Sequence, residues 1–345
     1  MVNFAEGMAN NSTETSNHEE NVSEILTDAI IWAVIGVVTV ITNFSIFVCT
    51  VTSNINQNLF FTVLNSSFLI GILFGGFYIL PQWAAEYFTS EIPGLCFLLP
   101  SLGSLLLLCY NLHQCFISID RYYAVKWPIC YRKKIHKSCY IYFITAIWLF
   151  SLLFVSIPFM TYRIVEVENC TNLSDEAAEN VFLFITFIAT NILPVIIIIF
   201  CYANIYHKFY RQRSKTFALT TSANQQSKRS VDNKTIKASI QMGFLVIIFM
   251  VLMLPSTFIF TFGSLGLMSS LPGIVAYHLH IVSRYVSFLY PAVNPLLYCY
   301  FVDSIRSAVK SKILTKLCFH NENSVSVYQE RNNSGTVLVN YTSNS

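Results

Sequence analysis

The stretch Asp120-Arg121-Tyr122 ends one apolar run of this chain, and Asn294-Pro-Leu-Leu-Tyr298 lies near the end of another. A charged pair at the end of a helix of membrane-spanning length is unfavourable unless it meets water or a partner, so such charges are functional candidates. The simpler interpretation is that they only mark where the helix leaves the bilayer. Pro295 changes this balance, because it removes a helical hydrogen bond that Asn294 and Tyr298 are placed to compensate.

The composition is that of a membrane protein. Of 345 residues, 54% are hydrophobic and 11% are charged, against roughly 25% charged in a soluble domain. A helix needs about 20 apolar residues to cross about 30 Å of hydrocarbon, and seven runs are long enough. They lie at residues 29–52, 59–83, 95–121, 140–160, 180–207, 237–267 and 273–301. We therefore predict an all-α membrane protein built as a bundle of seven transmembrane helices.

The basic residues predict the orientation, because they stay preferentially on the cytoplasmic side of a bilayer. Residues 1–28 carry acids but no Lys or Arg, whereas Lys and Arg gather after the third, fifth and seventh runs. This pattern predicts a multi-pass protein of the plasma membrane with its N-terminus outside. The net charge of +3 then describes two opposite faces of one protein, and we expect no nucleic-acid partner.

One domain with polar ends is expected, because neither end is apolar enough to bury a core. Residues 1–28 are predicted to be an extracellular glycosylated tail, residues 29–318 the transmembrane domain, and residues 319–345 a cytoplasmic tail. Short triplets that accept N-linked sugars fall on the predicted outer side. They begin at Asn10, Asn11, Asn21, Asn169 and Asn172.

Three cysteines carry predictions. Cys96, at the mouth of the third helix, and Cys170, in the loop after the fourth, are expected on the outer face. In an oxidising compartment they would pair, although two free thiols are the alternative. Cys318 ends an amphipathic stretch that is expected to form a short eighth helix along the inner leaflet, with a palmitoyl group on the cysteine. The cysteines form no metal-binding pattern, so no metal or cofactor is predicted.

These motifs and their order resemble those of the rhodopsin-like (class A) G-protein-coupled receptors over residues 29–318. The stretch Cys115-Phe-Ile-Ser-Ile-Asp-Arg-Tyr-Tyr-Ala-Val125 is most similar to the trace-amine-associated and biogenic-amine receptors within that class. Besides the two opening motifs, the matching residues are Asn43, Cys96, Trp148, Pro194, Tyr202, Phe249 and Pro255.

The resemblance implies a receptor, not an enzyme, that binds a small extracellular ligand within the bundle and activates heterotrimeric G proteins. Arrestin, receptor kinases and the lipid bilayer are the further partners that it implies. The residues implied in activation and coupling are Asp120, Arg121, Tyr122, Tyr202, Asn294, Pro295 and Tyr298. Those implied in the ligand pocket are Gly103, Ser104, Leu107, Thr186, Met253, Ser256, Thr257, Phe260, Arg284, Tyr285 and Phe288.

Departures from the family pattern bear on the ligand. Amine receptors hold the ligand's ammonium group with an Asp on the third helix, where this chain has Gly103. A buried ammonium without a counter-ion is unfavourable by several kcal/mol, so we expect a neutral or acidic ligand. Arg284 is the only Lys or Arg in the outer half of any predicted helix. An intramembrane Arg needs a partner, which is either an anionic ligand or a structural acid such as Glu86.

Other departures bear on activation. The family's sodium-binding Asp on the second helix has Phe68 or Ser67 as its counterpart here, so sodium regulation is not expected. Met253 stands where the family usually has Trp, and Thr235 stands near the position at which many relatives have a Glu that locks the Arg corresponding to Arg121. The loss of that lock predicts raised basal activity.

Other functions stay open from the sequence alone. One is a divergent trace-amine or chemosensory receptor with an unusual amine site. Another is a small-molecule transporter, which would need polar residues along a path through several helices and is often built from paired halves that are not visible here. An intramembrane enzyme would need a catalytic constellation, whereas His113 stands alone and is read as a packing residue.

Overall fold

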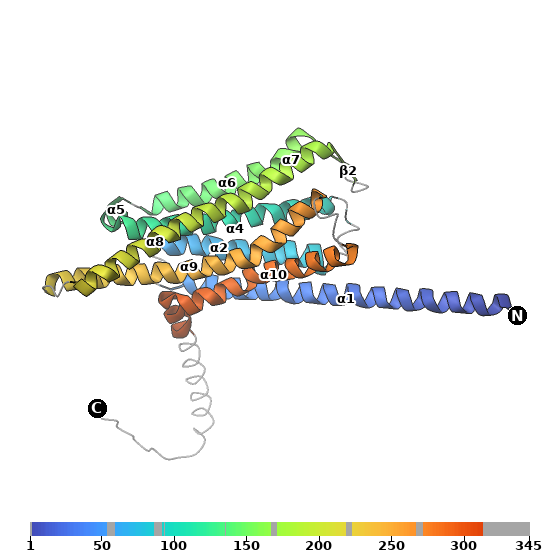
Figure 1. The fold of residues 1–345 in the computed structure, drawn as a ribbon, viewed down its shortest axis with the longest axis horizontal. Helices are drawn as coiled ribbons and strands as arrows, with labels where there is room; N and C mark the ends of the chain where they lie inside the picture. The colour runs from blue at the N-terminus through green and yellow to red at the C-terminus, as the bar shows by residue number, and fades with distance from the viewer. Residues whose placement is uncertain are drawn as a thin grey trace, which may run out of the picture.

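The computed structural model describes residues 2–53, 59–85, 92, 94–134, 136–166, 171–218, 223–266 and 272–312. Seven long helical units lie side by side in one elongated bundle (Figure 1), which confirms the predicted fold class. In chain order they are α1 (Val2–Val51); α2 (Leu59–Phe74) with the π-helix η2 (Gly75–Ala84); α4 (Leu95–Lys126); α6 (Lys137–Thr161); α7 (Glu176–Phe187) with the π-helix η3 (Ile188–Ile192) and α8 (Leu193–Ala218); α9 (Ala223–Ser264); and α10 (Gly273–Phe301).

Six spans within the described residues are long and apolar enough to cross a membrane. The seventh unit, α10, has 29 residues but is less apolar, because it carries Arg284 and two histidines in one half and two prolines and Asn294 in the other. Ser283, Ser287 and Asn294 are buried, so part of this polarity faces the bundle interior. The six spans are Ile25–Val51, Phe60–Ala84, Phe97–Lys126, Lys137–Thr161, Glu176–Arg211 and Ser239–Gly263.

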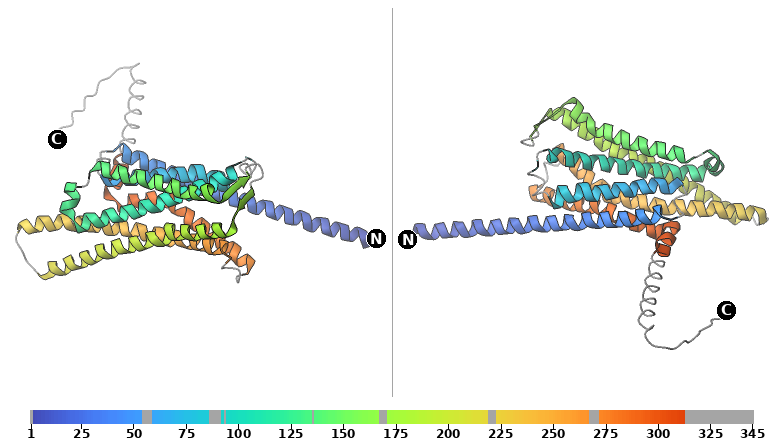
Figure 2. Two further views of the ribbon diagram at one scale, coloured as in Figure 1. Left: turned by 90° about the horizontal axis from the view of Figure 1, so that it is seen from above. Right: turned by 180° about the vertical axis from the view of Figure 1, so that it is seen from behind.

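The two ends of the chain differ in structure. The polar leader is helical from Val2 and projects beyond the bundle as an extension of α1 (Figures 1 and 2), away from any core. After a break at Val302, residues 303–312 form the predicted short eighth helix, whose Ile305 and Ala308 are buried. The side chains of Asn10, Asn11 and Asn21, and all of residues 313–345 with Cys318, lie outside the described residues. We call the bundle end that carries Arg121 the inner end and the opposite end the outer end.

The structure contains two short strands that the all-α prediction did not include. β1 (Arg163–Glu166) pairs antiparallel with β2 (Thr171–Ser174) in the loop between α6 and α7, at the outer end. The side chain of Asp175 caps α7 by accepting a hydrogen bond from the backbone nitrogen of Ala177 at 2.9 Å, as expected for an N-cap. Arg163 pairs with Glu179 and so joins the hairpin to α7. Four features of this region lie outside the described residues: the side chains of Cys96 and Asn172, and Asn169 and Cys170.

The side chain of Asn43 in α1 fastens α1 to α10. A proline at position 295 has no N–H, so the carbonyl oxygen of Pro291, four residues earlier, lacks its helical donor. Asn43 Nδ2 donates to this oxygen at 2.8 Å. The sequence had suggested Asn294 and Tyr298 for this compensation, but the donor comes from a different helix. The Asn43 amide packs directly against α2 at Gly71, which leaves room for it because glycine has no side chain.

Gly71→Ala tests this close approach. A Cβ at Gly71 would lie 2.3 Å from Oδ1 and 2.5 Å from Cγ of Asn43, so α2 and α1 must separate. We expect the free energy of unfolding to fall by about 1–3 kcal/mol, measured as thermal unfolding of the purified protein in detergent. The matched control is Gly76→Ala, whose Cβ would have only Val40 Cγ2 nearby, at 3.7 Å. Equal melting temperatures for the two variants would contradict the close approach.

Candidate functional site

The inner end of α4 holds an ion pair between neighbouring residues. Arg121 Nε donates to Asp120 Oδ2 at 2.9 Å, and Arg121 Nη2 pairs with the same oxygen. The guanidinium carbon lies 4.2 Å from the ring centroid of Phe60 at the start of the second span, a cation–π contact. The side chains of Arg121 and Asp120 are 14% and 4% exposed. The pair predicted from the sequence is therefore formed and is almost closed to solvent.

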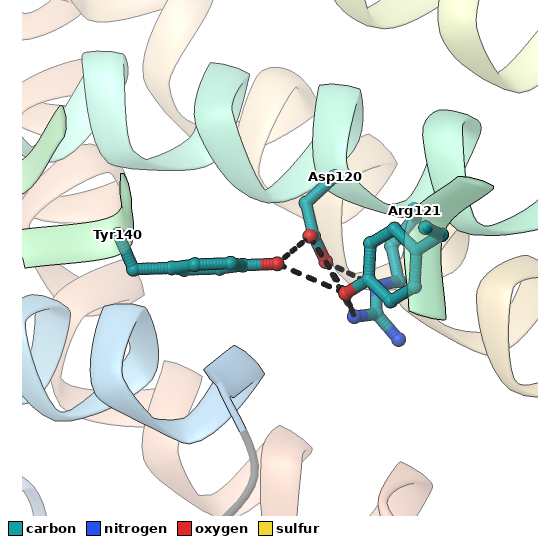
Figure 3. A network of polar contacts seen from close by, with 4 residues as sticks. Asp120, Arg121 and Tyr140 are labelled. Carbon is teal, nitrogen blue, oxygen red and sulfur yellow. Dashed lines mark hydrogen bonds and ion pairs between the residues drawn. The ribbon is translucent and has the colours of Figure 1, made fainter. Parts of the chain in front are cut away.

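Two phenol groups donate hydrogen bonds to the other carboxylate oxygen of Asp120. Tyr131, from the short helix α5 (Pro128–Lys134), donates to Oδ1 at 2.9 Å. Tyr140, near the start of α6, donates to the same oxygen (Figure 3). Burial, followed by the charge of Asp120, raises the pKa of Tyr131 to about 12, so its hydroxyl keeps its proton at neutral pH. Asp120 therefore joins α4, α5 and α6 at one point.

Sequence reasoning had not identified these phenols. Tyr140 is 2% exposed although it opens an apolar run, and a buried phenol needs a hydrogen-bond partner. That rule could have flagged Tyr140, but nothing in the sequence indicated that its partner is Asp120.

The other predicted activation residues surround this pair without bonding to it. Tyr122 faces α8, where its ring contacts Phe200 with centroids 5.8 Å apart. Tyr202 packs on Gly243 of α9, and among the described residues its hydroxyl has no hydrogen-bond partner. Tyr298 is buried, and its ring contacts Phe68 edge-on at 5.9 Å.

The middle of the bundle is held by an amide and two phenols. Asn294 Nδ2 donates to the hydroxyl of Tyr110 on α4 at 2.6 Å, and the Tyr290 hydroxyl donates to Asn294 Oδ1 at 2.9 Å. Phe68 and Ser67, the two candidate counterparts of the family's sodium-binding Asp, are both completely buried. Neither carries a charge at this level of α2.

At the outer end, the ring of Tyr78 in η2 covers Gly103 of α4. A Cβ added at Gly103 would lie 2.3 Å from Cε2 and 2.4 Å from Cζ of Tyr78. The Tyr78 ring packs on Phe74 and Phe288, with centroids 5.1 and 6.0 Å away. The space beside Gly103 is thus filled by a tyrosine from another helix.

Beside Tyr78, aromatic residues of α1, η2 and α10 form a continuous cluster. Trp32 contacts Trp83 at 5.4 Å and Tyr285 at 4.8 Å between ring centroids. Asp28 accepts hydrogen bonds from Trp32 Nε1, at 3.1 Å, and from the Tyr285 hydroxyl. Tyr285, one of the predicted pocket residues, therefore faces α1 within this aromatic cluster. The guanidinium carbon of Arg284 lies 4.3 Å from the ring centroid of Trp83.

The remaining predicted pocket residues lie across α4, α7 and α9. Thr257 donates to Asn191 Oδ1 in η3 at 2.8 Å, and the buried Thr186 hydroxyl has no hydrogen-bond partner among the described residues. Ser104 is exposed, Ser256 is half-buried, and the side chain of Phe260 lies outside the described residues. Met253 and Leu107 line a narrow apolar cavity below Tyr78. Its lining is Ile70, Gly71, Phe74, Leu106, Leu107, Tyr110, Met253 and Pro291.

His113 is a packing residue, as predicted. Its ring nitrogens lie 2.9 Å from Ser66 Oγ and 2.7 Å from the carbonyl oxygen of Cys109. Both nitrogens are therefore used inside the core, and neither is left for catalysis or for a metal.

A bundle of seven helices with a buried Asp–Arg pair at one end defines the class of membrane signal receptors. The chain belongs to the family described as 7 transmembrane receptor (rhodopsin family), which it matches over residues 36–298. It is 26% identical to trace amine-associated receptor 8b of Rattus norvegicus over 237 residues, which cover 64% of this chain and 67% of that receptor. It is 26% identical to trace amine-associated receptor 6 of Homo sapiens over 235 residues, or 64% and 66% of the two chains. The resemblance drawn from the sequence is confirmed, and the protein is a receptor rather than a transporter or an enzyme.

Asp120→Asn tests whether the ion pair restrains Arg121. Asparagine keeps the volume and an acceptor oxygen for the phenols but removes the charge that holds the guanidinium. A hydrogen bond to a charged group contributes about 1.5–3 kcal/mol, so we expect ligand-independent nucleotide exchange on the G protein to rise roughly tenfold at equal surface expression. Asp303→Asn is the matched control, because its pair with Arg306 is exposed and contributes little. Unchanged exchange in the Asp120 variant would contradict the restraint.

Proposed function

We propose that this receptor binds a small neutral or acidic ligand at the outer end of its bundle and activates heterotrimeric G proteins at the inner end. The observation that carries the coupling half is the closed contact of Arg121 with Asp120 and Phe60. A ligand shifts a receptor only through a difference in its affinity for two states. In the active state, α9 moves outward about Pro255 and Arg121 leaves Asp120 to bind the G protein, while Tyr202 and Tyr298 turn toward it.

The helix α4 gives the two ends a physical connection. It has 32 residues and is about 48 Å long at 1.5 Å per residue, with Gly103 near one end and Arg121 near the other. Met253 of α9 lies between these levels, beside the narrow apolar cavity. Methionine is flexible and polarizable, so its side chain adapts when the ligand changes the packing at this level.

The ligand class follows from the charges beside the outer aromatic cluster. The named relatives are trace amine-associated receptors, but at Gly103 this chain has no carboxylate for an ammonium group. Arg284 stacks on Trp83, where it would repel an ammonium and attract a carboxylate, since bidentate Arg–carboxylate contacts are strong in desolvated sites. The rival is a divergent amine site that uses Asp28, whose oxygens are bonded to Trp32 and Tyr285.

The further assignments complete this proposal. The N-terminus lies outside the plasma membrane, and arrestin and receptor kinases act at the inner end. Cys96 and Cys170 form a disulfide, and the ring of Phe68 in place of an acid leaves the receptor insensitive to sodium. The proposed modifications are palmitoylation at Cys318 and glycosylation at Asn10, Asn11, Asn21, Asn169 and Asn172.

Arg121→Ala tests the coupling half. Arg121 lies at the inner end with its side chain 14% exposed, and the change removes the donor for the G protein while Tyr131 and Tyr140 still donate to Asp120. We expect ligand-dependent nucleotide exchange to be lost while surface expression stays largely intact. Lys126→Ala is the control, since Lys126 is exposed at the end of the same helix. Exchange at the wild-type level in the Arg121 variant would refute the role.

Arg284→Gln tests the ligand half. Amines and carboxylic acids of the same carbon skeleton are screened in pairs for thermal stabilisation of the purified protein. We expect stabilisation by one or more acids and none by the paired amines, and the effect of the acids should be lost in Arg284→Gln. Arg306→Gln removes the same charge at the inner end and should leave acid binding unchanged. Amine binding that persists in Arg284→Gln would overturn the proposed ligand class.

A further inference from the structure

We propose that Tyr78 is the residue that closes this receptor to amines, because its ring occupies the space that an acidic side chain at Gly103 would need. The proposal rests on the proposed function and deepens it, since it names the side chain that determines the ligand class. It also explains why Gly103 is a glycine. The large ring of Tyr78 fits beside Gly103 because glycine has no side chain.

The distances show that the space is filled. Ordinary contacts of a Cβ with neighbouring atoms are about 3.4–4 Å, whereas a Cβ at Gly103 would meet three ring carbons of Tyr78 at 2.3, 2.4 and 2.8 Å. A carboxylate would extend beyond this Cβ and collide further. The obstacle is three adjacent carbons of one aromatic ring, which move only if the whole ring moves. An acid at this position therefore requires the ring to leave.

The ring is held where it is by its neighbours. Phe74 and Phe288, both buried, contact it from α2 and α10. Close packing on α1 fixes the height of η2, because a Cβ at Gly75 would lie 3.0 Å from the carbonyl oxygen of Gly36. π-helical turns such as η2 occur frequently at functional sites. Moving Tyr78 would thus disturb its contacts with Phe74 of α2, Phe288 of α10 and Gly103 of α4.

Tyr78 also changes the chemistry at the place it fills. It offers a neutral phenol where amine receptors of the family have a carboxylate, and its ring contacts Phe288, as does the ring of Trp83 on which Arg284 stacks. The corner between η2, α4 and α10 therefore has a cation and a hydroxyl group where an amine would need an anion. Both the shape and the charge of this corner exclude an ammonium group.

The first experiment is a thermal-unfolding cycle on the purified full-length receptor, without any ligand. Gly103→Ala is made in the wild type and in Tyr78→Ala. We expect Gly103→Ala to lower the melting temperature by several degrees in the wild type and to have little effect once Tyr78 is alanine, because residues in contact are not additive. Equal losses in the two backgrounds would overturn the proposal.

The second experiment asks whether opening the space admits an amine. The variants are Gly103→Asp, Tyr78→Ala/Gly103→Asp and the uncharged control Tyr78→Ala/Gly103→Asn, and the probe is 2-phenylethylamine. We expect the amine to stabilise Tyr78→Ala/Gly103→Asp alone. Stabilisation of Gly103→Asp with Tyr78 present would overturn the proposal, and so would the absence of stabilisation in the double variant. An amine that stabilises the wild type would instead refute the proposed ligand class, so the two failures are distinguishable.

Discussion

The hydrogen bond from Asn43 to the carbonyl oxygen of Pro291 is the constraint on which the rest of the bundle depends. A carbonyl without a partner in hydrocarbon is unfavourable by several kcal/mol, and Pro295 creates one in the second half of α10. Asn43 satisfies it at 2.8 Å, and Thr42 adds a bond to the carbonyl of Ala292 at 2.9 Å. Because Gly71 leaves room for the amide, α1, α2 and α10 are fixed at one relative height.

That height places the residues of α10 at both ends of the receptor. Three residues after Pro291, Asn294 reaches Tyr110 of α4, and further inward Tyr298 packs on Phe68. Toward the outer end, Phe288 contacts Tyr78, Trp32 and Trp83. By fixing α10 to α1, the Asn43 and Thr42 hydrogen bonds therefore link the aromatic corner that would receive a ligand to the tyrosines near Arg121.

The sequence was sufficient for the elements and for the charged motif, but not for the partners that other helices bring. Long apolar runs predict helices because each must satisfy its own backbone in lipid, and Asp120 beside Arg121 predicts a pair because the two are neighbours. The sequence showed that no acid stands at Gly103, but it did not predict that the ring of Tyr78 fills this space. Tyr140 at Asp120 and Asn43 at Pro291 are likewise contacts between distant positions, and their geometry depends on how helices approach. The β1–β2 hairpin was missed because four-residue strands are too short to show a pattern.

The departures from the family share one physical consequence. Gly103 and the Ser67–Phe68 pair are the positions where the resemblance to the family led us to expect acids, and here the ring of Tyr78 fills the space beside Gly103 while Phe68 is itself a buried ring. Asp120 is then the only charged side chain in the buried class among the residues that the structure describes. The buried charge is therefore at the inner end, in the pair of Asp120 with Arg121. In the outer half, the charge of Arg284 would select the ligand, and packing would carry its effect inward, from the Tyr78 and Phe288 rings to the adaptable side chain of Met253 and along α4 and α9. Packed interfaces of this kind switch between discrete arrangements and do not deform continuously, which suits a receptor with two states.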